Sequence, residues 1–582
     1  MRNLILCLFI TTGVIIASSC SETPNDNSDV VKVAVPGSVL STDKARYAPN
    51  ETVTFSIDRA IPAGSKVRYR HLNTIVADEP ISGKTWTWTP STADFKGYLV
   101  EIYYTVEDKE KIIATTGVDV SSDWTRFPRY GFLSSYNAKT ETEINFVIDN
   151  LKQFHINGLQ YYDWLSDHHK PLAGTPDAPA EAWLDLIGRT NTRATTTGYI
   201  AAAQKRNIAS MWYDLCYGAL NNAADDDVQE SWYLFKNTNK TNKDTHVLNS
   251  PFRSSIYLVN PSNPDWLNYF SQRVKDVYTV YDFDGFHIDQ LGNRGTLYDY
   301  SGSQVNLPDG FEKFIRKMKT DFPNKTHAFN AVSGYGQKKI ISAGVNFTYN
   351  EIWGEQPNYA DLKTLIDENH SYNNNLNCVF AAYMNYDLGK QKGVFNTPGI
   401  LMTDAVMFAL GASHLELGEH MLCNEYFPNT NLTMDNTLKK ALMSYYDFLV
   451  AYQNILRDGG SFNTVDIATT DGNPAIVAWF PSVTGKIVSL AKKIDNRQVV
   501  HLFNFVNAAH LQWRDLNGTQ TEPRLQQNLP LMLSVSQAVK KIWVATPDKE
   551  GSMYEDVTFT QNAGVVNFTL PALKYWTMIV IE

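Results

Sequence analysis

The feature that most constrains the fold is a regular alternation of short apolar runs with longer amphipathic segments between residues 130 and 456. Eight apolar runs have strand length: Tyr130–Ser134, Gly158–Trp164, Ile208–Leu215, Gly285–Leu291, His327–Val332, Phe347–Trp353, Cys378–Asn385 and His414–His420. Segments of helical length fill the gaps, among them Glu141–Phe154, Pro264–Tyr278, Gly310–Thr320, Tyr359–Glu368, Gly399–Leu410 and Leu438–Leu456. Eight strand-then-helix units in roughly 330 residues predict a (β/α)8 TIM barrel. The rival fold is an open doubly wound sheet, but neither a glycine-rich phosphate turn nor a P-loop is present to favour it.

Both flanks of the predicted barrel show a different pattern, in which apolar and polar residues alternate. In residues 31–122 the pattern is clearest at Thr52–Ile57, and short strands at this spacing predict an immunoglobulin-like β-sandwich. In residues 458–582 it returns, for example at Val499–Val506, and predicts an antiparallel β-sandwich. The expected protein is therefore multidomain, with an α/β barrel over residues 123–457 and an all-β domain on each side.

The first residues have the character of an export signal. Arg2 precedes an apolar stretch from Leu4 to Ala17, which is too short for a membrane span but typical of a secretory signal. The small residues that end at Cys20 resemble the lipobox of bacterial lipoproteins, which implies lipidation of Cys20 after removal of residues 1–19. Residues 20–30 are then a flexible tether, and we expect an exported lipoprotein held in the outer membrane by its lipid, on the surface or periplasmic side. Ordinary signal cleavage, with Cys20 incidental, is the alternative.

Charge and metal-ligand content exclude several functions. The net charge of −10 disfavours nucleic-acid binding, which needs a basic face. Cys216, Cys378 and Cys423 have neither disulfide nor zinc spacing, so we expect small buried apolar side chains. His168 and His169 are adjacent and have no further ligand cluster, so we interpret them as loop histidines. No metal or organic cofactor is expected.

The fourth predicted strand ends in a carboxylate. In an α/β barrel the chemistry collects at the C-terminal ends of the strands. Because side chains alternate along a strand, Phe286 and Ile288 should face the helices while His287 and Asp289 face the barrel mouth. Asp289 is then a catalytic candidate, and the alternative is a buried Asp that fixes a loop through backbone amides.

The sixth predicted strand ends in a second carboxyl group. Glu351 shares its parity with Tyr349 and Trp353, and apolar surroundings of this kind raise the pKa of a carboxyl. Glu355, four residues later, is the competing candidate. One ionised and one protonated carboxyl group together meet the requirement for cleaving a glycosidic bond.

Other strand ends carry polar and aromatic side chains that suit a sugar ring, whose hydroxyl groups need hydrogen bonds and whose C–H face needs an apolar plate. These candidate substrate-binding residues are Asp163, Trp164, Trp212, Asp214, His287, Gln290, Tyr349, Trp353, Asn385, Glu416 and Glu419.

Four stretches resemble glycoside hydrolase family 66, which comprises dextranases and cycloisomaltooligosaccharide glucanotransferases. They are Arg126–Phe132, His155–Trp164, Gly285–Gly292 and Tyr349–Trp353. The resemblance covers the mature chain and implies an immunoglobulin-like domain, a (β/α)8 barrel and a C-terminal β-sandwich. It also implies endo-hydrolysis of α-1,6-glucan with retention, with Asp289 as the nucleophile and Glu351 as the general acid and base.

Within this family the cyclising transferases carry a large carbohydrate-binding insertion after barrel strand seven. Here the interval from Asn385 to Gly399 has room only for a loop, so the resemblance favours a dextranase that releases isomaltooligosaccharides from dextran. Two alternatives stay open: a transglycosylase acting on α-1,6-glucan, and a surface lipoprotein that binds glycan without catalysis.

Overall fold

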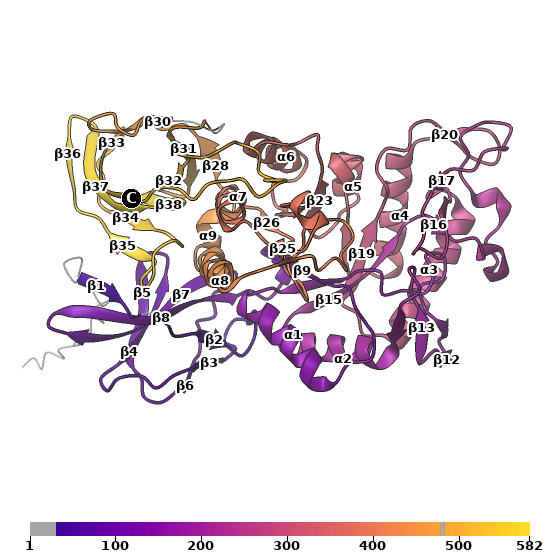
Figure 1. Cartoon of the computed structure of the whole chain (residues 1–582), viewed down its shortest axis with the longest axis horizontal. Helices are drawn as coiled ribbons and strands as arrows, with labels where there is room; N and C mark the ends of the chain where they lie inside the picture. Colours follow the sequence, from indigo (N-terminus) through magenta and orange to yellow (C-terminus); the bar gives the residue numbers. More distant parts are fainter. Residues whose placement is uncertain (1–30, 36, 478–479, 481–482) are drawn as a thin grey trace, which may run out of the picture.

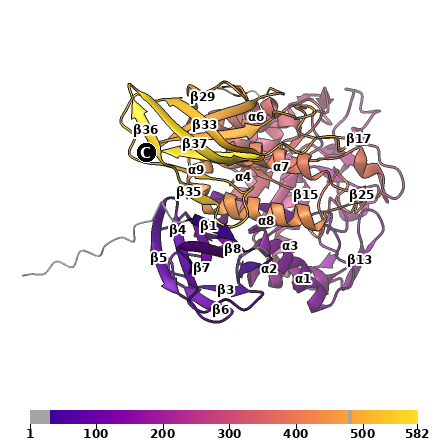
Figure 2. The same ribbon diagram turned by 60° about the vertical axis from the view of Figure 1, so that its left-hand side comes forward.

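The computed structural model describes residues 31–582 except 36, 478–479 and 481–482. The signal peptide predicted for residues 1–19, the tether predicted for residues 20–30 and the lipidation site at Cys20 lie outside the described residues. The described chain is a mixed α/β structure with many β-sheets. The N-terminal and C-terminal strands lie together at one end of the molecule, and the strand–helix region extends to the other (Figures 1 and 2). In the part of the chain that is described, no helix combines the length and apolar character required to span a bilayer.

The N-terminal region is built from two sheets. Their strands are β1 (Val31–Ala34), β2 (Leu40–Thr42), β3 (Val53–Ile57), β4 (Lys66–His71), β5 (Thr74–Pro80), β6 (Thr85–Trp88), β7 (Lys96–Val106) and β8 (Lys109–Val120). One sheet has the order β1-β8-β7-β4-β5 and the other β2-β3-β6. Strand β3 alternates buried and exposed residues along its whole length, as a strand with one solvated face must. Its buried residues, Val53, Phe55 and Ile57, join one apolar core with residues of the other sheet.

Within the described residues, eight parallel strands follow. They are β9 (Tyr130–Leu133), β10 (Gly158–Tyr161), β15 (Ala209–Leu215), β19 (Gly285–Asp289), β22 (Thr326–Phe329), β23 (Thr348–Ile352), β24 (Cys378–Ala382) and β26 (Ser413–His414). Pairing gives one sheet in the order β22-β19-β15-β10-β9 and another in the order β23-β24-β26. Two isolated parallel bridges connect them, Asn330 with Tyr349 and Phe132 with Gly418. Each predicted apolar run therefore overlaps one strand.

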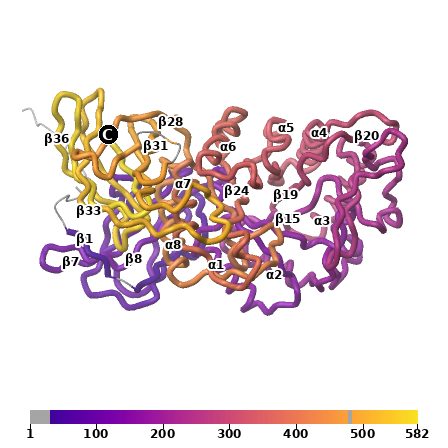
Figure 3. Tube along the Cα trace, turned by 45° about the horizontal axis from the view of Figure 1, so that its top comes forward, coloured from indigo at the N-terminus to yellow at the C-terminus, as the bar shows by residue number. Residues whose placement is uncertain are grey.

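A helix follows each of these strands, as Figure 3 traces along the chain. The helices are α1 (Glu141–Gln153), α2 (Arg193–Gln204), α3 (Pro264–Val280), α4 (Leu307–Asp321), α5 (Gln337–Ser342), α6 (Tyr359–Tyr372), α7 (Thr397–Ala409) and α8 (Asn436–Ala451). Sequence motifs set their ends: Thr140 and Glu143 form a capping box at the start of α1, and Pro264 and Pro308 lie in the first turns of α3 and α4.

Two predicted elements differ from the observed ones. The run His414–His420 was expected to be one strand, but β26 ends at His414 because the chain turns back, with an isolated bridge between Leu417 and Met421. The helix predicted for Leu438–Leu456 is two helices, α8 and α9 (Gln453–Leu456), because Tyr452 departs from helical backbone angles.

The two faces of the parallel strands pack into separate apolar clusters. Residues such as Phe286 and Ile288 belong to the large core shared with the helices. Residues of the opposite parity, such as Tyr130, Phe347 and Tyr349, form a second cluster. Packing is tight between strands as well as across them: a Cβ atom on Gly285 would lie 2.3 Å from the Thr326 carbonyl oxygen, so only glycine fits at the start of β19.

Short elements in the loops after the strands cover one end of this region. They are β11 (Gly174–Thr175), β12 (Ala178–Pro179), β13 (Ala182–Leu184), β14 (Thr190–Thr192), β16 (Gly218–Ala219), β17 (Thr245–His246), β18 (Ile256–Leu258), β20 (Leu297–Tyr298), β21 (Gln304–Val305), β25 (Gly393–Val394) and β27 (Leu432–Thr433).

The C-terminal region again consists of sheets. Its strands are β28 (Ser461–Asn463), β29 (Ile467–Thr469), β30 (Ile476–Val477), β31 (Ile487–Ile494), β32 (Arg497–Asn504), β33 (Gln526–Ser534), β34 (Ile542–Ala545), β35 (Tyr554–Asp556), β36 (Phe559–Asn562), β37 (Val565–Leu573) and β38 (Trp576–Ile581). One sheet runs β28-β31-β32-β38-β34-β35, with β30 paired to β31, and the other β29-β33-β37-β36. An apolar cluster of their inward side chains, such as Val500, Leu531 and Ile579, joins the two sheets.

A buried ion pair ties the N-terminal sheets to the parallel strands. Arg129, immediately before β9, contacts Asp119 of β8 at 2.8 Å, and neither side chain is exposed. Gln453 of α9 donates to the same carboxylate at 2.9 Å. The pair therefore joins three separate stretches of chain, and because it is desolvated its loss is costly.

We predict that Asp119→Asn lowers the free energy of unfolding by about 3–5 kcal/mol, because the buried Arg129 guanidinium loses its counter-charge. Urea denaturation followed by circular dichroism measures the change. The control is Asp367→Asn, which removes an exposed pair with Lys363 on α6 and should leave the midpoint almost unchanged. Equal midpoints for both variants would contradict the prediction.

Candidate active site

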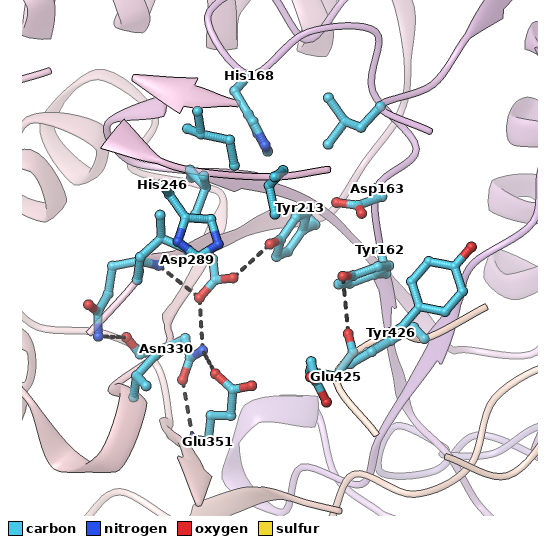
Figure 4. A pocket seen from close by; sticks show the side chains of 18 of the residues that line it. Tyr162, Asp163, His168, Tyr213, His246, Asp289, Asn330, Glu351, Glu425 and Tyr426 are labelled. Atoms are coloured by element: carbon cyan, nitrogen blue, oxygen red, sulfur yellow. Dashed lines mark hydrogen bonds between the residues drawn. The ribbon is translucent and has the colours of Figure 1, made fainter. Parts of the chain in front are cut away.

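A cavity of about 770 Å³ lies at the C-terminal ends of the parallel strands. Its lining comes from strand-end side chains and from the loops that follow them, and Figure 4 shows these side chains converging from several strands. Asp289 of β19 and Glu351 of β23 are both part of the lining. His287 lines the cavity too, whereas Phe286 packs in the core, as the alternation along the strand predicts.

One amide group links the two carboxylates. Asn330 follows β22, and its Nδ2 donates to Asp289 Oδ1 at 2.8 Å and to Glu351 Oε2 at 3.1 Å (Figure 4). Since both acceptors bond to the same nitrogen, these lengths of 2.8 and 3.1 Å limit the distance between the two oxygens to about 5.9 Å. The Asn330 Oδ1 atom accepts the backbone N–H of Glu351 at 3.2 Å, which fixes the amide orientation. The two carboxyl groups therefore face a common space at a set spacing.

Asp289 is surrounded by donors. The Tyr213 hydroxyl donates to Oδ2 at 2.7 Å, while the Gln290 backbone N–H donates to Oδ1 at 2.8 Å. Burial raises the pKa of Asp289, and the bonds from Tyr213, Asn330 and Gln290 oppose this rise because they stabilise the anion. Such a carboxylate is held in one orientation and is ready to act as an anion.

Glu351 lies in less favourable surroundings for a charge. Burial, and then the negative charge of Asp289, raise its pKa to about 7, although bonds from Tyr383 and Asn330 act in the other direction. The Tyr383 hydroxyl donates to Oε1 at 2.7 Å. Tyr349 and Trp353 also line the cavity beside it. Glu351 can therefore hold a proton near neutral pH and release it there, which is the property of a general acid and base.

A third carboxyl group lies in the same cavity. Burial raises the pKa of Asp163 to about 7, with the charge of Asp185 the next contribution. Nearby, His168 lines the cavity and its Nδ1 lies 2.7 Å from Asp214 Oδ1. Burial lowers the pKa of His168 to about 3, so its imidazole is neutral. Asp163 and His168 offer polar groups that can hydrogen-bond a hydroxylated ligand.

Aromatic side chains form the opposite side of the cavity. Tyr162 stacks on Phe427 with centroids 4.2 Å apart, and its hydroxyl donates to the Glu425 carbonyl oxygen at 3.2 Å. Tyr162, Glu425, Tyr426 and Phe427 all belong to the lining. Flat rings beside directed polar groups are what a sugar ring requires.

The structure brings many of the predicted residues together. Besides Asp289 and Glu351, the lining includes Asp163, His287, Gln290, Tyr349 and Trp353. Glu355, the alternative acid, is exposed outside the lining and accepts a bond from the Ser333 hydroxyl at 3.1 Å.

Two predicted tryptophans are elsewhere. Trp164 and Trp212 are fully buried in the core under the helices. The Trp212 ring stacks on Phe286 with centroids 3.9 Å apart, so it faces the helices, and its neighbour Tyr213 points into the cavity. The interpretation of both tryptophans as sugar-binding plates was wrong. Trp212 has the parity of β15 that faces the helices. Trp164 follows the end of β10 and packs against Trp183 and Tyr281.

Four predicted polar residues lie outside the cavity lining. Asp214 holds His168, as described above. Asn385 is buried and donates to the Asp515 carbonyl oxygen at 2.7 Å. Glu419 accepts the Ser134 backbone N–H at 3.1 Å. The side chains of Asp214, Asn385 and Glu419 are thus engaged in contacts outside the cavity lining. The fourth residue, Glu416, is buried behind β26.

Glu416 belongs to the group that, within the described residues, could hold a metal ion. Its carboxylate, that of Asp404 and the His414 ring offer ligand atoms within 4.8 Å of one another. His414 Nδ1 lies 2.8 Å from Asp404 Oδ1, and His414 Nε2 donates to the Ala382 carbonyl oxygen at 2.7 Å. Burial raises the pKa of Asp404 to about 8, so protons shared within the group can satisfy it. The group is outside the cavity lining and cannot touch a ligand there.

Sequence reasoning missed Asn330, Tyr213, Tyr383 and His168. Asn330 lies near the end of the fifth predicted strand, His327–Val332, and the rule that chemistry collects at strand ends would have found it. Tyr213 and Tyr383 needed the correct parity of their strands, and His168 needed its contact with Asp214, which sequence does not reveal.

Comparisons with known proteins show similarity to one enzyme family. The model of the family described as "Glycosyl hydrolase family 66" matches residues 42–580. A cycloisomaltooligosaccharide glucanotransferase of Niallia circulans is 26% identical over an alignment 709 positions long, gaps included. The alignment covers 93% of this chain and 71% of that protein. A dextranase of Streptococcus salivarius is 23% identical over an alignment 609 positions long, gaps included. The alignment covers 90% of this chain and 71% of that protein. The crystal structure of a Paenibacillus sp. cycloisomaltooligosaccharide glucanotransferase complexed with cycloisomaltoheptaose matches with a TM-score of 0.83 and 25% identity, over 93% of this chain and 99% of that one.

We predict opposite changes in the pKa of Glu351 in two variants. Asp289→Asn should lower it from about 7, because a negative neighbour is removed, and Tyr383→Phe should raise it, because the ionised form loses a donor. Difference infrared spectroscopy across neutral pH follows the carboxyl band. Shifts of the same sign would show that Glu351 is not coupled to these two groups.

Proposed function

Because the chain belongs to glycosyl hydrolase family 66, we propose that it is a retaining endo-dextranase that hydrolyses α-1,6-glucosidic bonds to release isomaltooligosaccharides. The observation that carries this proposal is the shared amide of Asn330, which keeps the Asp289 and Glu351 oxygens within about 5.9 Å. Carboxyl groups roughly 5–5.5 Å apart are typical of retaining glycosidases, and inverting enzymes need roughly 6.5–9.5 Å to admit a water molecule. The substrate is proposed from the names of the relatives, a dextranase and glucanotransferases.

In the first step Asp289 attacks the anomeric carbon while Glu351 gives its proton to the departing oxygen. The C–O bond to the leaving sugar breaks, and a covalent glycosyl–Asp289 ester forms. After burial, the charge of Asp289 is the largest cause of the raised pKa of Glu351. The ester carries no such charge, so the pKa of Glu351 falls and its deprotonated form is stable as a base. In the second step Glu351 takes a proton from water, the water oxygen attacks the anomeric carbon, and Asp289 is released.

Tyr213 and Asn330 serve the charge that changes during this cycle. Both side chains donate hydrogen bonds to Asp289. These bonds weaken when Asp289 becomes an ester and strengthen again when it leaves as a carboxylate. Preorganised donors of this kind favour departure of the nucleophile in the second step. Asp163 and the neutral His168 are positioned to hold sugar hydroxyl groups.

A glucanotransferase is the second candidate, because two of the relatives described above carry that name. The chain between β24 and α7 favours hydrolysis, since it contains only the short helix η5 (Leu388–Lys390) and β25 and leaves no room for an inserted domain. A non-catalytic glycan-binding protein is disfavoured, because the two carboxyl groups retain a full set of donors.

The same family supports the finer architecture. We infer that the eight parallel strands close into a (β/α)8 barrel over residues 123–457, with the two isolated bridges marking the joins between its sheets. An immunoglobulin-like sandwich over residues 31–122 and a β-sandwich over residues 458–582 complete it. Export as an outer-membrane lipoprotein, anchored through Cys20, stays a proposal from the sequence.

Digestion of dextran tests the proposed function. We expect linear isomaltooligosaccharides from the earliest times, and the new reducing ends should first appear as the α-anomer in proton NMR because two displacements retain configuration. First appearance of the β-anomer would contradict the retaining mechanism. Cyclic products would indicate the transferase, and polymer that is bound but unchanged would indicate a binding protein.

Substitution of the two carboxyl groups tests their roles. Asp289→Asn and Glu351→Gln should each lower kcat by about 1000-fold or more, since an amide neither attacks nor protonates well. Glu355→Gln is the matched control, outside the cavity lining, and should keep most of the activity. Azide should restore turnover by Glu351→Gln on an activated substrate, because it replaces the water that needs a base. An inactive Glu355→Gln beside an active Glu351→Gln would transfer the acid role to Glu355.

A further inference from the structure

A loop of the C-terminal region forms the back of one cavity wall. Residues 505–525, between β32 and β33, pack against the segments that follow β23 and β24. The Asn385 and Asp387 backbone N–H groups donate to the carbonyl oxygens of Arg514 and Leu516 at 2.9 and 3.0 Å. The Trp513 indole N–H donates to the Gln356 carbonyl oxygen. This loop is therefore hydrogen-bonded to the segment that follows β23, the strand of Glu351, and to the segment that follows β24 and Tyr383.

Arg514 places its guanidinium among aromatic rings. Its Cζ lies 5.1 Å from the Tyr386 ring centroid and 5.8 Å from that of Trp353. The residue is 9% exposed, Nε donates to the Tyr383 carbonyl oxygen at 3.3 Å, and Nη2 is buried without a hydrogen-bond partner among the described residues. The charge is thus stabilised mainly by ring faces and not by a carboxylate in contact with it.

The groups that Arg514 touches are those beside the proposed acid. Trp353 lines the cavity two residues after Glu351, and Tyr383 hydrogen-bonds Glu351. The Tyr386 hydroxyl donates at 2.9 Å to Glu425, which also lines the cavity. The guanidinium thus contacts the segments that follow β23 and β24, and Tyr386 links them to Glu425.

We propose that Arg514 is a positioning residue for the sugar on the leaving-group side of the cleavage point. The general acid must face the departing oxygen, so the wall beyond Glu351 is where the departing glucosyl unit, or an acceptor sugar, is held. Arg514 keeps Trp353 in place as the apolar plate for that unit, and Tyr386, outside the cavity lining, packs on the same guanidinium. This inference rests on the proposed function, and it assigns leaving-group recognition to a region outside the strand–helix region.

The chemistry of the residue matters for this role. A planar guanidinium can pack between rings on its flat faces, whereas a lysine ammonium is a compact charge on a thin stem and leaves the space between the rings unfilled. Lysine at position 514 should therefore restore the function only in part.

Two substrates separate this role from a general structural one. Dextran needs both the acid and a bound leaving sugar, whereas isomaltosyl fluoride releases fluoride, which needs neither. We expect Arg514→Met to lower kcat/KM for dextran by about 10–100-fold, mostly through KM, and to leave the fluoride rate within about twofold. Arg514→Lys should lie between wild type and Arg514→Met on dextran. Arg497→Met, in the same C-terminal region but paired with Glu582, is the control and should match wild type on both substrates.

Equal rates of wild type and Arg514→Met on dextran would overturn the inference, and so would an equal loss on both substrates. A wild-type protein that cleaves neither substrate would overturn the proposed function instead. In that case calorimetric titration with isomaltotriose still tests the wall: weaker binding by Arg514→Met than by Arg497→Met supports it, and equal binding overturns it.

Discussion

The two hydrogen atoms of one side-chain amide set the geometry on which this site depends. Asn330 gives one N–H to Asp289 and the other to Glu351, and its oxygen is held by the Glu351 backbone. The spacing of the carboxyl groups is thus determined by a third residue, which follows the strand between theirs in sequence, and not by their own rotamers alone. Because both N–H bonds are used, Asn330 has none left for a substrate hydroxyl, and recognition must come from the surrounding residues.

Burial raises the pKa values of both Asp289 and Glu351, but the neighbours that act on these pKa values differ. Asp289 accepts from Tyr213, Asn330 and Gln290, which favours the anion, while burial and the charge of Asp289 raise the pKa of Glu351. The effect of Asp289 on the pKa of Glu351 depends on whether Asp289 is a free carboxylate, since a neutral ester at this position carries no negative charge. In the proposed mechanism, the alternation of Glu351 between acid and base therefore follows the covalent state of the neighbouring side chain.

The sequence could predict the parts that follow from periodicity. Eight apolar runs gave the positions of eight strands, and alternation placed His287 and Asp289 on one face and Phe286 on the other. At Trp212 a polar neighbour suggested a site, but the same alternation places the ring in the core. Contacts between distant segments were out of reach: nothing local in the sequence links Arg514 to Trp353 or Asn385 to Asp515. Such contacts depend on how separately folded regions pack, which residue order does not encode in any short window.

The packing of β19 on both faces has a consequence for how such a protein can change over time. One extra residue in this strand would turn Asp289 to the apolar face on which Phe286 packs against Phe270, and would send an aliphatic side chain into the cavity. Substitutions can be sampled one at a time, but a change of strand length exchanges every inner and outer position at once. Natural variation in chain length should accordingly be confined to the connecting loops, and new specificities should arise there while the strands keep a constant count.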